Sequence, residues 1–284
     1  MDSPLDPAAH SWFFCGIGGS GMLPLAQIVH GLGGDVAGSD RSHDQGRTAD
    51  KFAWLEASGF TLHPQDGSGI TSARQIVVAS AAVENTVPEI VRATELGCPR
   101  MTRAELKAQQ VLEQAGLRKA PIPVEELPAR YGIRVRSEPF EGDISGMLFR
   151  DQDGKRAVIG VNAKHSSHRQ RFTVAHELGH YLLHRGRPMI VDKTVRVNRR
   201  DQISSMATDR EEIEANAFAA ELLMPRKLVE AESRKILKAS PVITDHELVD
   251  RLADEFDVST QAMEYRLVNL GLLSPMVAGS GTSL

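Results

Sequence analysis

Short apolar runs alternate with helical patterns along the first third of the chain. The runs at 12–15, 35–38 and 75–79 have the length of buried strands, whereas 22–32 and 87–96 carry apolar residues at helical spacing. Strands that alternate with helices are typical of βαβ units, which form a parallel sheet covered by helices. The pattern therefore predicts an α/β, Rossmann-like domain at the N-terminal end.

The pattern changes after about residue 104. A helix that ends near Gly116 is followed by a proline-containing join and by three short strands at 133–136, 146–150 and 157–161. We expect a turn at 151–154 between the last two strands. This part of the chain therefore predicts a second, α+β domain.

Helical patterns dominate the rest of the chain. Two long helices are predicted at 167–184 and 210–223, and two shorter ones at 245–256 and 259–270 have helix-turn-helix spacing. We therefore expect a small helical C-terminal part. The predicted domains are 1–108, 109–240 and 241–284.

Composition narrows the class of protein. The chain has 284 residues, 41% hydrophobic residues and a formal net charge of -4, which gives no global electrostatic reason to bind nucleic acid or an anionic membrane. Its two cysteines, Cys15 and Cys98, exclude a disulfide framework. Because no leader or long apolar run is evident, we expect a cytoplasmic protein with no membrane association.

The segment HELGH at 176–180 is the main candidate for chemistry. His176 and His180 lie four residues apart on a predicted helix, so both rings can face one metal ion, and zinc is the expected cofactor. Glu177 can accept a proton from the attacking water without ligating the metal. Gly179 is expected to leave room for a substrate backbone beside the ion.

The helix at 210–223 supplies the third ligand that a catalytic zinc needs. Glu212 is the preferred candidate, because Asn216 lies one turn later and could orient a zinc histidine. Glu214 is the second candidate. A solvated helix surface is the simpler interpretation of Glu214 and of Glu211.

Other polar residues near the motif are assigned structural or surface roles. His165, His168 and His184 are close in sequence, but the ligand set is complete without them. Tyr181 and His184 are weak candidates for stabilising the transition state.

Three segments resemble the ImmA/IrrE family of metallo-endopeptidases over about residues 111–273. They are RFTVAHELGH at 171–180, EIEANAFAAELLMP at 212–225 and DISG at 143–146. The resemblance implies a zincin-like core with a helical C-terminal part.

By the same resemblance, His176, His180 and Glu212 are zinc ligands and Glu177 is the general base. Because some members cleave repressors or other regulators of the helix-turn-helix class, the resemblance implies a regulatory protein as substrate, in stress or mobile-element control. We expect the strand at 157–161 to be the sheet edge that pairs with an extended substrate.

A glycine-rich segment follows the first predicted strand. Its pattern, G-x-G-x-x-G over Gly16 to Gly21, precedes a helix, so its glycines allow a tight turn and its amides can face phosphate. Asp40 ends the next strand, where a carboxylate can bind a ribose hydroxyl. The alternative is a nucleotide-type scaffold that binds nothing.

A longer set of segments resembles the N-terminal domain of Mur ligases, of the UDP-N-acetylmuramate–L-alanine ligase type, over about residues 11–108. The segments are FCGIGGSGM at 14–22, GSD at 38–40, ASAA at 79–82, NTVPEI at 85–90 and RAEL at 103–106. The resemblance implies that a UDP-N-acetylmuramate-like ligand places its diphosphate at the glycine loop. The implied contacts are Gly18, Gly19, Ser20, Gly21 and Asp40, with Gly16 in the same loop and Ser80 as a further candidate.

The sequence lacks the P-loop G-x-x-x-x-G-K-[ST] that a complete Mur ligase needs for ATP. The N-terminal domain is therefore interpreted either as a sensor that controls the peptidase or as a vestige. A nucleotide-sugar-binding module with a secondary or inactive peptidase half is the alternative function for the whole chain.

The C-terminal helix pair resembles a DNA-binding motif in spacing only. Its second helix offers Gln261, Arg266 and Asn269, but also Glu264, and the preceding helix is acidic. We expect packing or partner recognition there and no direct DNA binding.

Overall fold

The computed structural model describes residues 7–80, 83–151, 156–184, 189–193 and 204–274. They fall into two compact units. The first comprises the described parts of Met1–Val111, Gly179–Arg185 and Val197–Phe218, and the second comprises those of Leu112–Leu178, Gly186–Arg196 and Ala219–Leu284. Helices α6 (Ser167–Leu183) and α7 (Ser204–Leu223) each contribute to both units. The domain boundaries expected from the sequence are not these divisions, and they stay a prediction.

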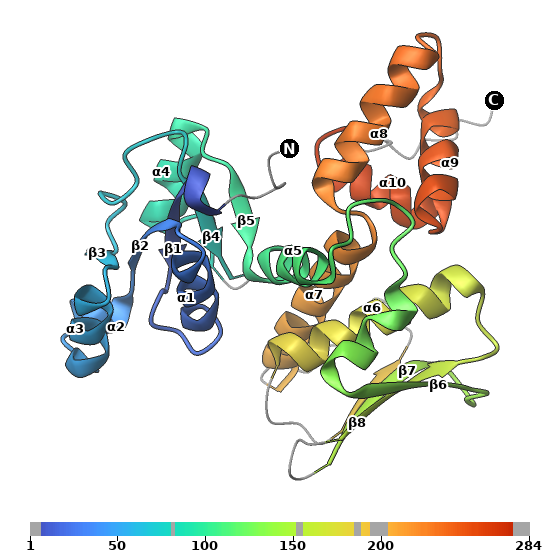
Figure 1. The fold of residues 1–284 in the computed structure, drawn as a ribbon, viewed down its shortest axis with the longest axis horizontal. Helices are drawn as coiled ribbons and strands as arrows, with labels where there is room; N and C mark the ends of the chain where they lie inside the picture. Colours follow the sequence, from blue (N-terminus) through green and yellow to red (C-terminus); the bar gives the residue numbers. More distant parts are fainter. Residues whose placement is uncertain (1–6, 81–82, 152–155, 185–188, 194–203, 275–284) are drawn as a thin grey trace, which may run out of the picture. The chain divides into compact units, whose positions relative to one another are not determined.

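A five-stranded parallel sheet forms the centre of the N-terminal region (Figure 1). Its order is β3-β2-β1-β4-β5. Strands β2 and β3 are therefore added on one side of β1, and β4 and β5 are added on its other side. This is the Rossmann-like arrangement that the sequence predicts, with its ligand-binding crevice expected at the carboxyl ends of the strands beside β1. The strands are β1 (Ser11–Cys15), β2 (Asp35–Ser39), β3 (Thr61–His63), β4 (Ile76–Ala79) and β5 (Arg100–Thr102).

Helices connect these strands. Those predicted from periodicity are present. The strands β3 and β5 and the helix α2 are not predicted, because runs of three or four residues carry little periodicity, and the nine-residue helix α3 is not predicted either. The helices are α1 (Leu23–Gly31), α2 (Arg41–Asp44), α3 (Ala49–Ala57), α4 (Pro88–Leu96) and α5 (Arg103–Ala115), with a 3-10 turn at Pro7–Ala9.

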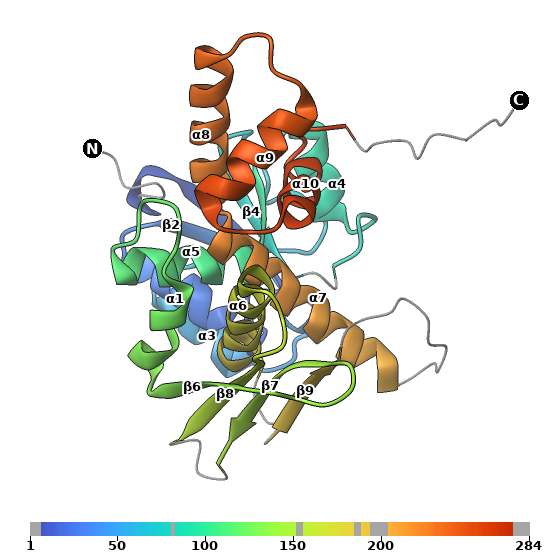
Figure 2. The same ribbon diagram turned by 90° about the vertical axis from the view of Figure 1, so that its right-hand side faces the viewer.

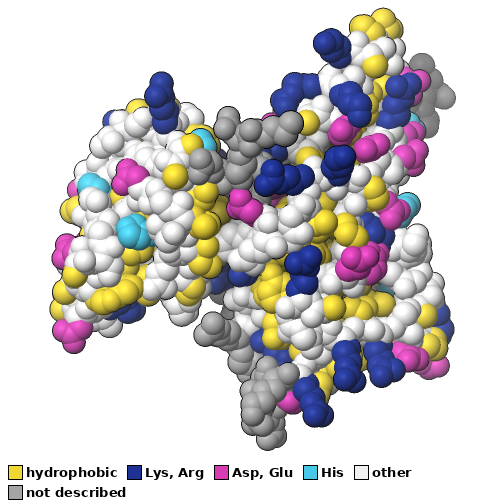
Figure 3. Space-filling view, viewed as in Figure 1, with side chains coloured by type: hydrophobic (Ala, Val, Ile, Leu, Met, Phe, Trp, Pro, Cys, Tyr) yellow, Lys and Arg dark blue, Asp and Glu magenta, His cyan; other side chains and the backbone are white. Residues whose placement is uncertain are grey.

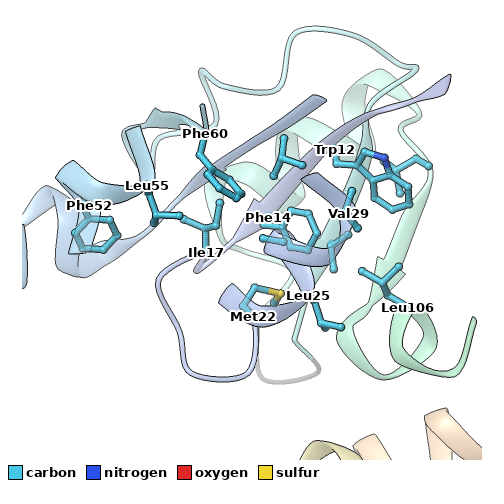
Figure 4. Close-up of a cluster of buried hydrophobic side chains, with 14 residues drawn as sticks. Trp12, Phe14, Ile17, Met22, Leu25, Val29, Phe52, Leu55, Phe60 and Leu106 are labelled. Carbon is cyan, nitrogen blue, oxygen red and sulfur yellow. The ribbon is translucent and has the colours of Figure 1, made fainter. Parts of the chain in front are cut away.

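The first strand is buried on both faces, which explains its unbroken apolar sequence. Trp12 and Phe14 join the cluster drawn in Figure 4, together with side chains from α1 and α3. Phe13 and Cys15 point to the opposite face and pack in a second cluster with Ile90 of α4. The two-layered core fixes the position of the glycine loop that follows β1.

A second sheet has the order β6-β8-β7-β9. Strand β8 pairs in parallel with β6 and antiparallel with β7, so Ile159 lies between Val135 and Leu148. The expectation that the strand at 157–161 is an edge is therefore wrong, and within the described residues the edges are β6 and β9. The strands are β6 (Ile133–Glu138), β7 (Ile144–Arg150), β8 (Ala157–Asn162) and β9 (Met189–Lys193). Most of the turn predicted at 151–154 lies outside the described residues.

The remaining helices complete the C-terminal region (Figure 2). Helix α7 begins at Ser204, earlier than predicted, and α8 was not predicted at all. Helix α9 begins with a capping box between Thr244 and Glu247. The last three helices are α8 (Arg226–Ala239), α9 (Asp245–Phe256) and α10 (Thr260–Asn269), and 3-10 turns occur at Val124–Glu126 and Pro128–Tyr131. No helix in the described part of the chain has the length and hydropathy needed to cross a bilayer.

Arg266 is a structural residue rather than a surface one. Its guanidinium is buried, donates to the Met224 carbonyl over 3.0 Å and forms an ion pair with Glu221 of α7. The second helix of the predicted helix-turn-helix therefore does not display this arginine. On the face shown in Figure 3, basic and acidic side chains are interspersed over the region of α8 and α9, without a continuous basic patch.

Candidate metal centre and glycine-rich loop

Helix α6 carries the HELGH segment in a buried position. His176, Glu177 and His180 are all nearly inaccessible to solvent, and Ala175 and Leu178 bury the apolar side of the same helix. Ligand atoms of His176, His180 and Glu212 lie within 4.8 Å of one another. Helices α6 and α7 thus bring together the three residues that the sequence proposed as ligands.

The geometry of these donors suits a small divalent cation. Nε2 of His180 lies 3.2 Å from Oε1 of Glu212. Donors about 2.0–2.1 Å from a tetrahedral zinc lie about 3.3 Å apart, so this pair needs little rearrangement to share one ion. Two histidines and one carboxylate also leave a fourth coordination position for water, as catalytic zinc sites do. The residues present therefore fit zinc.

Gly146 of β7 lies next to Glu177, the proposed base. A Cβ atom at this position would lie 2.9 Å from Oε1 of Glu177 and would overlap the methyl group of Thr173. Only glycine lets β7 approach α6 this closely. Gly146 ends the segment DISG at 143–146, and no local pattern in the sequence indicates its contact with Glu177.

Gly179 has a different role from the expected one. A Cβ atom here would lie 3.0 Å from Cδ1 of Phe218 and 3.3 Å from Cα of Ala215. This glycine therefore permits close packing of α6 on α7. The expectation that it leaves room for substrate is not supported, because α7 fills the space.

Glu214 does not join the three-donor group. Its Oε2 lies 3.0 Å from Nε2 of His184, and the same carboxylate forms an ion pair with Arg103 of α5. Burial disfavours the charged form, but hydrogen bonds from His184 and Arg103 and the positive charge of the arginine outweigh it and lower the pKa of Glu214. Glu214 is thus a buried, ionised carboxylate and not a solvated surface residue.

His184 lies between Glu214 and the proposed ligand His180. Its Nδ1 is 3.1 Å from Nδ1 of His180, one helical turn earlier. The sequence predicts a structural role for His184 or, as an alternative, a role in stabilising the transition state. The four-residue spacing from His180 was the signal that the two rings share a helix face.

The remaining candidates near the motif lie elsewhere. Nε2 of His168 is 3.2 Å from Oδ1 of Asp257, at the turn before α10. Neither His168 nor His165 belongs to the three-donor group found among the described residues. Tyr181 is half-buried on α6.

The glycine-rich loop uses most of its amides internally. The amide of Gly16 donates to the Ser39 carbonyl, and that of Gly19 donates to the Gly16 carbonyl. The amide of Gly18 donates to Oδ2 of Asp40 over 2.9 Å. The positive φ of Gly16, 73°, needs a glycine.

Asp40 closes the loop and also begins a helix. Its Oδ1 accepts from the Ser42 amide at the start of α2, while Oδ2 accepts from Gly18. A Cβ at Gly18 would lie 2.8 Å from the Phe52 ring and 3.0 Å from this carboxylate. Both carboxylate oxygens therefore have protein partners, and the predicted contact of Asp40 with a ribose stays a prediction.

Two amides of the loop take no part in these internal hydrogen bonds. Within the described residues, Ser20 and Gly21 have no hydrogen-bond partner for their amides, and they immediately precede α1. A Cβ at Gly21 would overlap the guanidinium of Arg103. Two open amides beside a guanidinium make a positively polarised place next to a helix N-terminus.

Comparison with known families divides the chain in the same way as the motifs do. Residues 128–268 match the family model described as IrrE N-terminal-like domain. Residues 13–114 match the model described as Mur ligase family, catalytic domain.

Similar curated proteins are UDP-N-acetylmuramate–L-alanine ligases. That of Vesicomyosocius okutanii is 36% identical over 104 residues, which are 37% of this chain and 21% of the relative. That of Streptomyces coelicolor is 40% identical over 96 residues, 34% of this chain and 20% of the relative. The chain thus matches about a fifth of the length of these relatives.

Solved structures add a weaker likeness. The crystal structure of UDP-N-acetylmuramate-alanine ligase from Thermotoga maritima is 20% identical, with a TM-score of 0.33, and the match covers 53% of this chain and 36% of that one. The family models are more informative. They show that the chain joins a Mur ligase-like domain to an IrrE N-terminal-like domain of the peptidase class.

Proposed function

We propose that this protein is a zinc-dependent endopeptidase whose ligands are His176, His180 and Glu212 and whose general base is Glu177. The observation that carries the proposal is the convergence of three donor groups from two helices. The match of residues 128–268 to the IrrE N-terminal-like model supports the same activity.

In this proposal His176, His180 and Glu212 hold the ion, and Glu177 moves a proton. When bound, zinc supplies a Lewis acid that polarises a carbonyl group and lowers the pKa of water. Glu177 adjoins the ligand His176 in the buried surface of α6. From there its carboxylate accepts a proton from the attacking water and returns it to the leaving amine.

An extended polypeptide suits the sheet next to this centre. Strand β9 is an edge strand and pairs with β7, the strand that places Gly146 beneath Glu177. A substrate that adds to this edge is bound through its backbone hydrogen bonds, and its alternate side chains provide the specificity. A helix-turn-helix-type regulator is the substrate class that we propose, on the resemblance of the three segments to the ImmA/IrrE family.

The function is tested by zinc content and cleavage of a panel of purified repressors, with wild type beside Glu177→Gln. The variant should hold zinc like wild type and lose cleavage, because it keeps the ligands but lacks the base. Wild type that holds zinc and cuts nothing in the panel would contradict the substrate class. Equal cleavage by the two proteins would contradict the role of Glu177.

A second candidate function is binding of a nucleotide sugar by the N-terminal domain. The open amides of Ser20 and Gly21 beside Arg103 favour it, as does the similarity to UDP-N-acetylmuramate–L-alanine ligases. UDP-N-acetylmuramate should then raise the melting temperature of wild type more than NAD does, and Arg103→Met should reduce the shift. Equal, negligible shifts with both ligands would indicate a scaffold that binds neither.

A further inference from the structure

A continuous series of polar contacts runs from the glycine loop to a proposed metal ligand. Arg103 lies against Gly21 and forms an ion pair with Glu214. Glu214 contacts Nε2 of His184, and Nδ1 of His184 contacts Nδ1 of His180. All these side chains belong to the first compact unit.

The start of α5 fixes one end of this series. Thr102 and Glu105 form reciprocal hydrogen bonds: the Thr102 amide donates to the Glu105 carboxylate, and the Glu105 amide donates to the Thr102 hydroxyl. This is the capping-box arrangement, which defines the first turn of a helix. Arg103, the first residue of α5, is therefore held at a defined place, with its guanidinium largely shielded from solvent.

The guanidinium at one end gives the contacts a direction. Arg103 can only donate, so Oε2 of Glu214 accepts from it, and the same oxygen accepts from Nε2 of His184 in the tautomer that is protonated on that nitrogen. Nδ1 of His184 then carries a lone pair and accepts from Nδ1 of His180. The remaining nitrogen of His180, Nε2, is left with its lone pair, and this is the atom that lies 3.2 Å from Glu212.

We propose that Arg103, Glu214 and His184 are positioning residues that hold His180 in the tautomer and orientation required for metal binding. The proposal rests on the zinc site of the proposed function. It adds that residues outside the peptidase motif take part: Arg103 lies in the segment that matches the Mur ligase model. The glycine loop is coupled to the metal centre because Gly21 and Glu214 contact the same guanidinium.

Variants of His184 test the hydrogen bond to His180. His184→Leu removes the acceptor and should lower zinc affinity by about 10- to 100-fold, the usual effect of losing an outer partner of a metal-bound histidine. His184→Gln restores an acceptor and should recover much of the affinity. Competition with a chromophoric chelator measures this affinity, and the absorption spectrum of the cobalt-substituted protein reports the geometry independently of activity.

Variants at the other end test the contribution of Arg103. The double substitution Arg103→Met with Glu214→Leu removes both charges together, which avoids leaving one of them buried and unpaired. It should lower zinc affinity, whereas Arg100→Met, on the exposed neighbouring arginine, should not. Gly21→Ala should weaken zinc binding by displacing the guanidinium, and Gly31→Ala is its control, because a Cβ there meets nothing within 4 Å.

The tautomers of His180 and His184 can be measured in the zinc-loaded wild type, so this test does not depend on the folding of any variant. Nitrogen-15 NMR should show a proton on Nδ1 of His180 and on Nε2 of His184. A proton on Nδ1 of His184, or wild-type zinc affinity in folded His184→Leu and in the folded double variant, would overturn the proposal while leaving the peptidase intact. Wild type that binds no zinc would overturn both.

Discussion

Nε2 of His180 and Oε1 of Glu212 lie 3.2 Å apart although they belong to different helices. Helix α6 supplies the histidine and α7 the carboxylate, and Gly179 lets the two helices pack closely enough for the pair to form. The site is therefore a product of helix packing as much as of the HELGH sequence.

Substitution of Gly146 should impair catalysis without removing the metal. In Gly146→Ala the added methyl group would press on Thr173 and on Glu177, which lies 2.9 Å from the position of the new Cβ. Displacing the base by a fraction of an ångström should lower kcat by about 10- to 100-fold. Zinc content and kcat measured together check this, with Gly31→Ala as a control for glycine replacement. A loss of zinc together with the loss of kcat would contradict the assigned role of Gly146 beside the base Glu177. A normal kcat would contradict it as well.

The two cysteines should be unreactive in the folded protein. Burial, reinforced by the nearby Glu89 carboxylate, raises the pKa of the Cys15 thiol to about 12, and burial also raises the pKa of Cys98. Because the thiolate is the reactive form, Ellman's reagent at pH 8 should label neither residue until denaturant is added. Rapid labelling of one thiol per chain in buffer alone would show that a core cluster is more open than described.

The buried ion pair between Glu221 and Arg266 should be important for stability. Glu221→Gln leaves the arginine charge without its carboxylate in a position almost closed to solvent, so the free energy of unfolding should fall by about 3–5 kcal/mol. Urea denaturation measures the change. Arg251→Gln, on the exposed side of α9, serves as the control and should change stability by less than about 0.5 kcal/mol. Similar, small changes in both variants would contradict a structural role for Arg266.

Much of the fold and of the candidate metal site could be predicted from the sequence because the signals are local. The apolar run at Trp12 and the four-residue spacing of His176 and His180 each follow from one element alone. The choice of Glu212 over Glu214 was also made from one helix, and the structure groups Glu212 with the histidines.

What could not be predicted depends on contacts between distant segments. The pairing of β8 on both sides is a matter of sheet order, which no strand pattern contains. Arg103 and Glu214 are ordinary helix residues until α5 and α7 place them together. Arg266 likewise looks like a surface residue in sequence, and only the packing of α10 against the end of α7 shows that it is buried.

The central claim, a zinc site formed by two helices, is tested most directly by the metal stoichiometry of purified protein reconstituted with zinc. We expect one zinc per chain in wild type, almost none in His176→Ala and Glu212→Ala, and full occupancy in Glu211→Ala, where a neighbouring carboxylate outside the three-donor group is removed. A wild-type protein that holds no zinc, or a Glu212→Ala variant that holds it as tightly as wild type, would contradict the account.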